Sequence, residues 1–380
     1  MRPTFQNILV RLPNWVGDVV MATPALKALR ESFPNSTITY LARPYVKQVI
    51  EGLPFFDRLI EHTSQGVFGP FLMGRRLKEG KFDAAFLFTD SFRSALEVFL
   101  AKIPRRIGYA TDFRTLLLTD RIDYELEEGK RKPVPMVNYY LKLIRHLGAT
   151  TEQLKPVLSV SDKSEKHAGE FLSQHGIREG DILVGFSPGA KFGSSKLWVP
   201  ERFAEVADAL TEKYGAKPII FCGPGEEEIS QKIAQAAHSP VIDTSDNIIA
   251  LDDLKAFIQR CDILITTDAG PRHFAVAFDK PVVVIMGPTD PRYTNANLEK
   301  TIILRVENLS CSPCHKKICP RNHECMTGIT SQQVLSAAGR LLARIFHRRG
   351  TENAEKRQKQ KGKERKIEES ENSDRVSFGV

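Results

Sequence analysis

Residues 7–30 read NILVRLPNWVGDVVMATPALKALR, and this stretch sets the fold of the first half of the chain. Residues 7–12 are a short apolar run of strand type, and after a loop a helical pattern continues through residue 33. Further strand-type runs follow at 36–41 and 84–88. Continuous apolar strands that alternate with helices predict a parallel sheet with helices on both faces.

The same pattern restarts after about residue 160. Strands are predicted at 182–186, 218–222, 263–266 and 282–286, and helices at 201–214, 226–237 and 252–260. Two such sets predict an α/β protein with two doubly wound, Rossmann-like domains. We place the domains at residues 1–165 and 166–347, with a polar junction near 155–180. Residues 348–380 are rich in Lys, Glu and Gln, so we expect a disordered tail, although a role at a membrane surface is an alternative.

Composition narrows the class of protein further. The 380 residues are 42% hydrophobic, but no apolar stretch is long enough to span a membrane, and the N-terminus does not resemble an export signal. We therefore expect a cytoplasmic protein with reduced thiols. Residues 1–150 carry 22 Lys and Arg against 15 Asp and Glu, whereas residues 151–347 carry 22 against 24. The basic first half indicates an anionic partner, and an ordinary solvated basic surface is an equally weighted alternative.

The first candidate site is the loop at residues 13–18, PNWVGD. Ligands of open α/β sheets gather beyond the carboxyl ends of the strands, and Gly17 permits a close backbone approach. Asp18 is either a helix cap or a general base, and local chemistry alone favours the cap. The helix begins either at Thr23, with Pro24 in its first turn, or near Asp18, with Pro24 inside it. A single glycine does not make the dinucleotide-binding motif, which argues against a dehydrogenase.

Loops after the later strands have the chemistry of a phosphate and sugar site. They are 187–196, with Ser187, Gly189 and Lys196; 223–227, with Glu226 and Glu227; 267–273, with Asp268, Gly270 and His273; and the turn 287–291, with Thr289. Small residues let backbone N–H groups approach an anion, and lysine supplies charge. The acid at 226 or 227 either accepts from ribose hydroxyls or simply favours the first helical turn. Because the chain has no Asp-x-Asp pair, we expect Lys196 and helix N-termini to stabilise a leaving diphosphate without an essential metal.

Four cysteines fall close together near the C-terminus. Cys311, Cys314, Cys319 and Cys325 follow the spacing C-x2-C-x4-C-x5-C, and His315 and His323 lie among them. This density in a cytosolic protein predicts a zinc or other thiolate site. The spacing is not that of a standard pair of zinc knuckles, so a reduced, metal-free loop is an equal alternative.

Residues 8–30, ILVRLPNWVGDVVMATPALKALR, and 266–291, TTDAGPRHFAVAFDKPVVVIMGPTDP, closely resemble the ADP-heptose:lipopolysaccharide heptosyltransferases. The stretch CSPCHKKICPRNHECM also looks like the second heptosyltransferase of core assembly within that family. The resemblance spans roughly residues 7–345. It implies a GT-B architecture, in which two Rossmann-like domains face a central cleft and bind the acceptor mainly on the first domain and the nucleotide sugar mainly on the second. It also implies inverting transfer without a metal.

The resemblance assigns roles by position. Asp18 matches the catalytic aspartate, Lys196 the lysine that contacts the diphosphate, and Asp268, Gly270 and His273 the donor-site D-x-G-x-x-H motif. The ribose-contacting acid aligns with either Glu226 or Glu227, and we take Glu226. Ser187, Gly189 and Thr289 complete the expected donor side, and Asn14, Gly17 and Arg93 the acceptor side.

The expected donor is ADP-L-glycero-D-manno-heptose, and the expected acceptor is the anionic heptosyl-Kdo2-lipid A inner core of lipopolysaccharide. We expect no further cofactor, no nucleic-acid partner, and a location at the inner face of the cytoplasmic membrane. Two alternatives stay open. One is a related family member with another acceptor or sugar, and the other is a nucleotide-sugar-binding protein or epimerase on the same scaffold. An epimerase needs no separate acceptor, which leaves the basic first half without a purpose.

Overall fold

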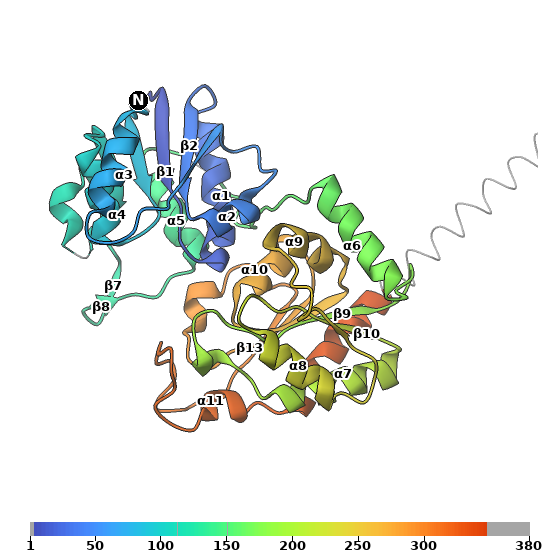
Figure 1. Cartoon of the computed structure of the whole chain (residues 1–380). Helices are drawn as coiled ribbons and strands as arrows, with labels where there is room; N and C mark the ends of the chain where they lie inside the picture. Colours follow the sequence, from blue (N-terminus) through green and yellow to red (C-terminus); the bar gives the residue numbers. More distant parts are fainter. Residues whose placement is uncertain (1–3, 112, 150, 348–380) are drawn as a thin grey trace, which may run out of the picture.

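A computed structural model describes residues 4–111, 113–149 and 151–347. The predicted tail at 348–380 lies outside the described residues. Two six-stranded sheets, each entirely parallel, form the centres of two domains (Figure 1). Both sheets have the doubly wound order in which the first strand lies in the middle and the chain then continues to the other side. The predicted α/β fold class is therefore confirmed.

The N-terminal sheet has the order β3-β2-β1-β4-β5-β6. Its strands are β1 (Asn7–Arg11), β2 (Thr37–Ala42), β3 (Arg58–Glu61), β4 (Ala84–Leu87), β5 (Arg105–Tyr109) and β6 (Asp120–Ile122). One face is covered by α1 (Val16–Ser32), α2 (Pro44–Ile50) and α5 (Met136–Arg145), and the other by α3 (Gly69–Lys78) and α4 (Phe92–Leu100). A short hairpin of β7 (Leu126–Glu127) and β8 (Lys130–Arg131) follows the sheet.

The C-terminal sheet has the order β11-β10-β9-β12-β13-β14. Its strands are β9 (Leu183–Ser187), β10 (Lys217–Ile220), β11 (Ile242–Asp243), β12 (Ile263–Thr267), β13 (Val282–Ile285) and β14 (Thr301–Leu304). The helices are α6 (Asp162–Gln174), α7 (Pro200–Tyr214), α8 (Glu227–Ala236), α9 (Leu251–Arg260), α10 (Gly270–Ala277), the short α11 (Glu324–Thr327) and a helical segment at 331–347. The division that we predicted between residues 165 and 166 falls inside α6, which packs on α9 of the second domain.

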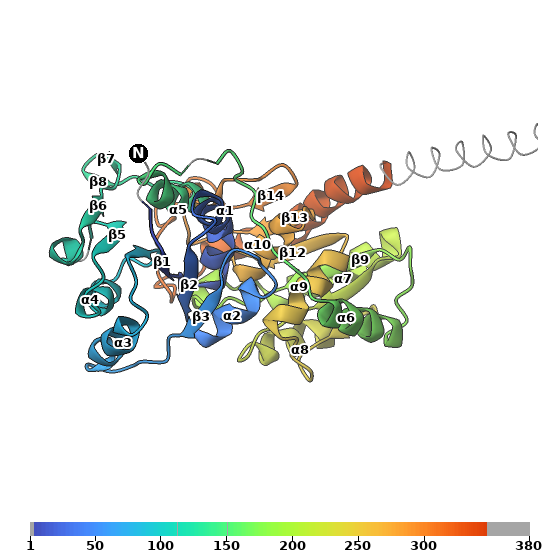
Figure 2. The ribbon, with the colours of Figure 1, turned by 90° about the horizontal axis from the view of Figure 1, so that it is seen from above.

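The two domains share one hydrophobic core. Side chains of α1 and α5 from the first domain and of α9 and α10 from the second belong to the same buried cluster. Helix α1 contacts α10, and the two helices lie side by side when the molecule is turned (Figure 2). Because apolar burial is the main favourable term in folding, this shared core fixes the loops of one domain against those of the other. No helix of the described residues is both long and apolar enough to cross a membrane.

Helix α1 shows how a local sequence conflict is resolved. The helix runs from Val16 to Ser32 with Pro24 inside it, so the alternative start at Thr23 is wrong. Proline has no N–H for the carbonyl oxygen of Val20, and the Thr23 hydroxyl donates to that oxygen instead, at 2.7 Å. The Thr23 hydroxyl also accepts from the backbone N–H of Val157, at 2.8 Å. The proline is therefore tolerated where the helix meets the segment that joins the domains.

Candidate active site

Asp18 lies in the first turn of α1, just beyond the carboxyl end of β1. The cap position belongs to Trp15, which makes no side-chain capping bond, so the interpretation of Asp18 as the helix cap is wrong. Within the described part of the chain no hydrogen bond to the Asp18 carboxylate is found. Burial raises the pKa of Asp18 to about 7, with Asp90 and Asp268 adding to the shift and Lys196 opposing it. A carboxylate with this pKa suits general-base catalysis near neutral pH.

Gly17 and His273 place the two domains in contact beside Asp18. A Cβ atom at Gly17 would lie 2.8 Å from Cδ2 of His273, and a Cβ atom at Gly270 would lie 3.0 Å from Cγ1 of Val16. Both distances are shorter than ordinary van der Waals contact. Glycine at these two positions therefore allows the loop after β1 to approach the start of α10, and the site lies at the boundary of the two domains.

Asp268, directly after β12, is the centre of a buried ionic cluster. One carboxylate oxygen accepts from Lys196 Nζ at 2.7 Å and from the Thr289 hydroxyl at 2.7 Å. The other accepts from Arg272 Nη1 at 2.8 Å. Burial alone would raise the pKa of Asp268, but Lys196 and Arg272 outweigh it and hold that pKa well below its usual range. Two cations against one carboxylate leave net positive charge for an anionic ligand.

His273 lies in the first half of α10 and is buried. Burial, with the positive charge of Arg272 beside it, lowers the pKa of His273 to about 3. The ring is therefore neutral at physiological pH. It can offer an N–H or a lone pair to a ligand, but the positive charge at this site comes from Lys196 and Arg272.

Glu226 and Gly189 bring together the predicted donor loops at 223–227 and 187–196. The Glu226 carboxylate accepts from the backbone N–H of Gly223 at 2.9 Å and lies over Gly189, where it would occupy the place of a Cβ atom. Glu227 instead turns back to the N–H of Gly225, at 3.1 Å. This geometry favours Glu226 over Glu227 as a ligand-facing acid. Ser187 ends the neighbouring strand β9 and is buried.

Asn14 and Arg93, both expected on the acceptor side, are held by local contacts. Asn14 Oδ1 accepts from the buried Arg11 guanidinium at 2.9 Å. Arg93 donates to the carbonyl oxygens of Ser64 and Gly66, at 3.1 and 3.0 Å, and so anchors the loop before α3. Contact of either side chain with an acceptor stays a prediction.

Sequence reasoning missed Arg272 and Asp90. Arg272 stands four residues after Asp268, which is a spacing that brings side chains together at the start of a helix. Asp90 follows β4 as Asp18 follows β1, and its carboxylate accepts from the hydroxyl groups of Tyr139 and, at 2.9 Å, Tyr124. Arg131 lies over the Tyr124 ring, 4.1 Å from its centroid. The strand-end position of Asp90 was the available signal.

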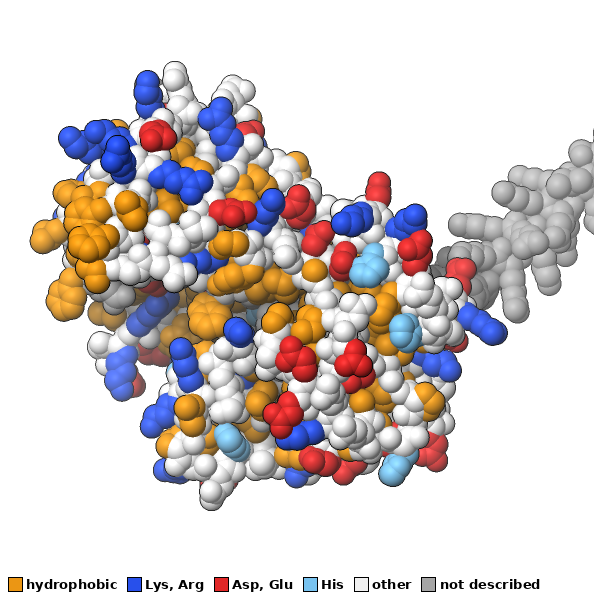
Figure 3. Space-filling view, viewed as in Figure 1, with side chains coloured by type: hydrophobic (Ala, Val, Ile, Leu, Met, Phe, Trp, Pro, Cys, Tyr) orange, Lys and Arg blue, Asp and Glu red, His pale blue; other side chains and the backbone are white. Residues whose placement is uncertain are grey.

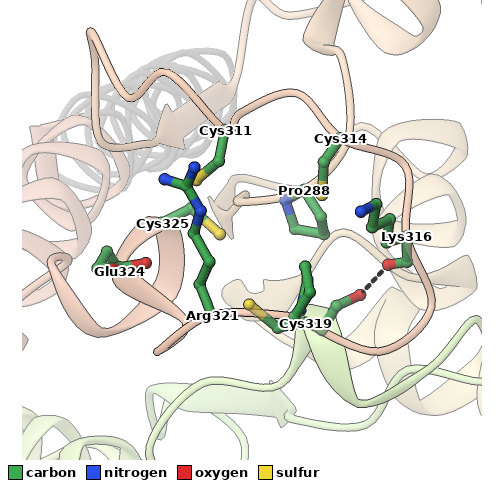
Figure 4. A pocket seen from close by; sticks show the side chains of 10 residues that line it. Pro288, Cys311, Cys314, Lys316, Cys319, Arg321, Glu324 and Cys325 are labelled. Carbon is green, nitrogen blue, oxygen red and sulfur yellow. Dashed lines mark hydrogen bonds between the residues drawn. The ribbon is translucent and has the colours of Figure 1, made fainter.

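The four clustered cysteines line one cavity of about 220 Å³, together with Pro288, Lys316 and Arg321 (Figure 4). All four are free thiols. As the side chains stand, no three His, Cys, Asp or Glu residues of the described chain have the geometry to hold a metal ion. The predicted thiolate metal site therefore gains no support from the arrangement.

The cysteine-rich loop instead supports the donor side. The backbone N–H of Ser195 donates to the carbonyl oxygen of Lys317 at 3.0 Å, and that of Cys314 to Pro288 at 3.0 Å. The loop thus holds the residues next to Lys196 on one side and next to Thr289 on the other. Both of those side chains bond to the same oxygen of Asp268.

The chain has two Rossmann-like domains, and its candidate site lies between them, with a basic cluster on one side and an unpaired carboxylate on the other. This arrangement defines a protein of the GT-B class. A family model described as "Glycosyltransferase family 9 (heptosyltransferase)" matches residues 71–324, and the chain belongs to that family. The predicted resemblance is confirmed, and the chain is a glycosyltransferase.

Similar proteins extend over nearly the whole chain. Lipooligosaccharide heptosyltransferase 2 of Haemophilus influenzae is 28% identical over 355 residues, which cover 89% of this chain and 100% of that protein. A family 9 glycosyltransferase from Veillonella parvula superposes with a TM-score of 0.78 at 27% identity, covering 90% and 99% of the two chains. The ADP-heptose lipopolysaccharide heptosyltransferase II of Escherichia coli gives 0.73 at 26% identity, covering 89% and 99%.

Proposed function

We propose that this enzyme transfers heptose from ADP-L-glycero-D-manno-heptose to heptosyl-Kdo2-lipid A, the inner core of lipopolysaccharide, with inversion and without an essential metal. The main support is the position of an unpaired carboxylate, Asp18, near a basic cluster of the other domain. Asp18 has a raised pKa and no hydrogen-bond partner among the described residues, whereas Asp268, Lys196 and Arg272 form a closed ionic network. The names of the similar proteins support the choice of sugar and acceptor.

The proposed reaction uses Asp18 as the general base. Its carboxylate removes the proton from an acceptor hydroxyl while that oxygen attacks the anomeric carbon of the donor. A new carbon–oxygen bond forms as the bond to the diphosphate breaks, and ADP leaves from the opposite face, so the anomeric configuration inverts. The proton stays on Asp18 and is later released to water.

The donor side stabilises the departing diphosphate. Lys196 and Arg272 supply positive charge, and the N-terminal end of α10 adds the partial positive charge of the helix dipole. Neutral His273 contributes at most a hydrogen bond. Glu226, which lies over Gly189, is placed to accept from ribose hydroxyls. The cysteine-rich loop holds the residues next to Lys196 and Thr289 in place.

Incubation of the enzyme with ADP-heptose, with and without heptosyl-Kdo2-lipid A, tests the function. Release of ADP that depends on the acceptor and persists in a chelator is expected, together with an inverted anomeric signal in the product. Isomerisation of the donor without acceptor would indicate an epimerase, and binding without turnover would indicate a binding protein. Transfer only to other members of an acceptor panel would identify a related family member with another acceptor.

A further inference from the structure

Large apolar side chains project from one end of the N-terminal domain. Phe113 is 95% exposed, Val67 86%, Leu116 84% and Phe68 75%. Four others in the same region are also exposed, namely Phe71, Leu72, Phe92 and Phe99. We call these eight side chains the apolar tip. The space-filling view shows hydrophobic side chains gathered at the end of the domain where α3 and α4 lie, with basic side chains beside them (Figure 3).

The apolar tip is built from neighbouring elements. Val67 and Phe68 precede α3, Phe92 begins α4, and Phe113 and Leu116 belong to the turn around Arg114–Leu117. Helix α3 packs on α4, and α4 packs on that turn. Val67, Phe68, Phe92, Phe113 and Leu116 follow the carboxyl ends of β3, β4 and β5, the same edge of the sheet at which Asp18 follows β1, whereas Phe99 lies near the far end of α4. Most of the tip therefore lies at the edge of the N-terminal domain that also carries Asp18, outside the active site itself.

The domain does not need these side chains for its own core. The inner faces of α3 and α4 are already packed on the sheet through residues such as Met73, Leu77, Ala95 and Val98. A surface helix normally presents polar residues on its outer face, whereas α3 presents Phe71 and Leu72 there. Contiguous exposed apolar surface of this kind marks a site of interaction.

The basic side chains near the apolar tip indicate which kind of partner it binds. Arg75, Arg76 and Lys78 lie exposed on α3, and the Arg106 guanidinium lies 5.5 Å from the centroid of the Phe99 ring. Apolar side chains with Lys and Arg around them match the boundary between the acyl chains and the anionic headgroups of a bilayer. A second copy of the chain would bring the same positive charges together, which disfavours self-association through this surface.

We infer that the apolar tip inserts into an anionic lipid surface and so holds the acceptor edge of the N-terminal domain against the bilayer. The inference rests on the proposed function only for the nature of the acceptor, whose acyl chains stay in the membrane while its sugars reach Asp18. The basic side chains supply long-range attraction, and Phe68, Phe113 and Leu116 supply apolar burial.

Vesicle cosedimentation of the full-length chain tests this inference. Wild type is compared with a Phe113→Ser/Leu116→Ser double variant and with Ile318→Ser, which removes a side chain that is 75% exposed on the other domain. Wild type and Ile318→Ser are expected to bind vesicles of phosphatidylcholine with phosphatidylglycerol, less tightly as salt rises, and the double variant at least about tenfold more weakly.

Three results would overturn the inference. The first is that the double variant and wild type bind vesicles equally, and the second is that wild type binds phosphatidylcholine vesicles as tightly as vesicles that also contain phosphatidylglycerol. The third is that wild type forms a dimer in sedimentation equilibrium and the double variant does not. The vesicle assay uses neither donor nor acceptor, so it stands even if heptose transfer is not found. With a water-soluble core fragment that lacks acyl chains, the double variant is expected to transfer heptose at the wild-type rate, because its substitutions lie outside the active site.

Discussion

Asp18 and Asp268 occupy comparable places in two similar domains, and their surroundings give them opposite properties. Each follows the carboxyl end of a central parallel strand. Asp268 is held by Lys196, Arg272 and Thr289, which keep its pKa well below the usual range. Asp18 has no such partners, and burial raises its pKa to about 7. Pairing, and not position in the fold, therefore decides which carboxylate is held in an ionic network and which is free to take a proton.

The largest expected effect comes from the unpaired carboxylate. Asp18→Asn should lower the transfer rate at least about a hundredfold, the scale of general-base catalysis. Binding of ADP should stay unchanged in calorimetry, because the Asp268 cluster is not altered. The raised pKa of Asp18 means that the folded state loses stability as pH rises from the ordinary pKa of an aspartate to about 7. Asp18→Asn should therefore unfold at an equal or higher temperature than wild type at alkaline pH. Near-native turnover with comparable stability would refute the role of Asp18.

Lys196→Ala removes one of the two cations that pair with Asp268. Loss of this cation should lower the transfer rate roughly a hundredfold, because the leaving diphosphate loses a charged hydrogen bond. Lys191→Ala is the matched control, since Lys191 is an exposed lysine on the same loop. Steady-state kinetics with donor varied should leave this control within about twofold of wild type. Equal losses in the two variants would mean that the loop contributes only general positive charge.

Gly17→Ala tests the contact between Gly17 of the first domain and His273 of the second. The added Cβ would lie 2.8 Å from the His273 ring, so the ring or the whole domain must move. We expect a loss of about 1–3 kcal/mol in the free energy of unfolding from urea titration. The Gly17→Ala/His273→Ala double variant should recover part of that loss, because the clash is removed. Strict additivity of the two substitutions would show that the loops do not press on each other.

The smallest effect is expected at the rim of the domain boundary. Glu127, on the β7–β8 hairpin, pairs with Arg292 of the other domain at 3.1 Å, and both side chains are about half exposed. Exposed ion pairs contribute little, so Glu127→Gln should leave the urea midpoint unchanged. A clear shift of that midpoint would instead identify the hairpin as a clasp that holds the domains together.

The central strands of both sheets were predictable because they are buried on both faces, whereas the more exposed outer strands β3, β5, β6, β11 and β14 were not predicted. The predicted strands at 7–12, 263–266 and 282–286 differ from β1, β12 and β13 by one residue at one end. Parallel strands read as continuous apolar runs, which is a strong local signal. The start of α1 was not predictable, because the Thr23 hydroxyl and the packing of α1 on α10 offset the cost of Pro24 inside the helix.

The candidate site was predictable in its residues but not in its pairing. Asp268, Lys196 and Thr289 come from three separate loops, and only the sheet order brings them together. Local propensity favoured Asp18 as a helix cap, whereas Trp15 occupies that position and leaves the carboxylate free. Asp90 was missed because its tyrosine partners lie far along the sequence.

The pH dependence of kcat/KM for the acceptor is the sharpest test of Asp18 as the general base. If Asp18 is the general base, kcat/KM should be constant above about pH 7 and fall tenfold per pH unit below it, because only the ionised carboxylate accepts a proton. The residual activity of Asp18→Asn should lack this step. A wild-type profile that stays flat down to about pH 5, or an identical step in Asp18→Asn, would contradict the assignment.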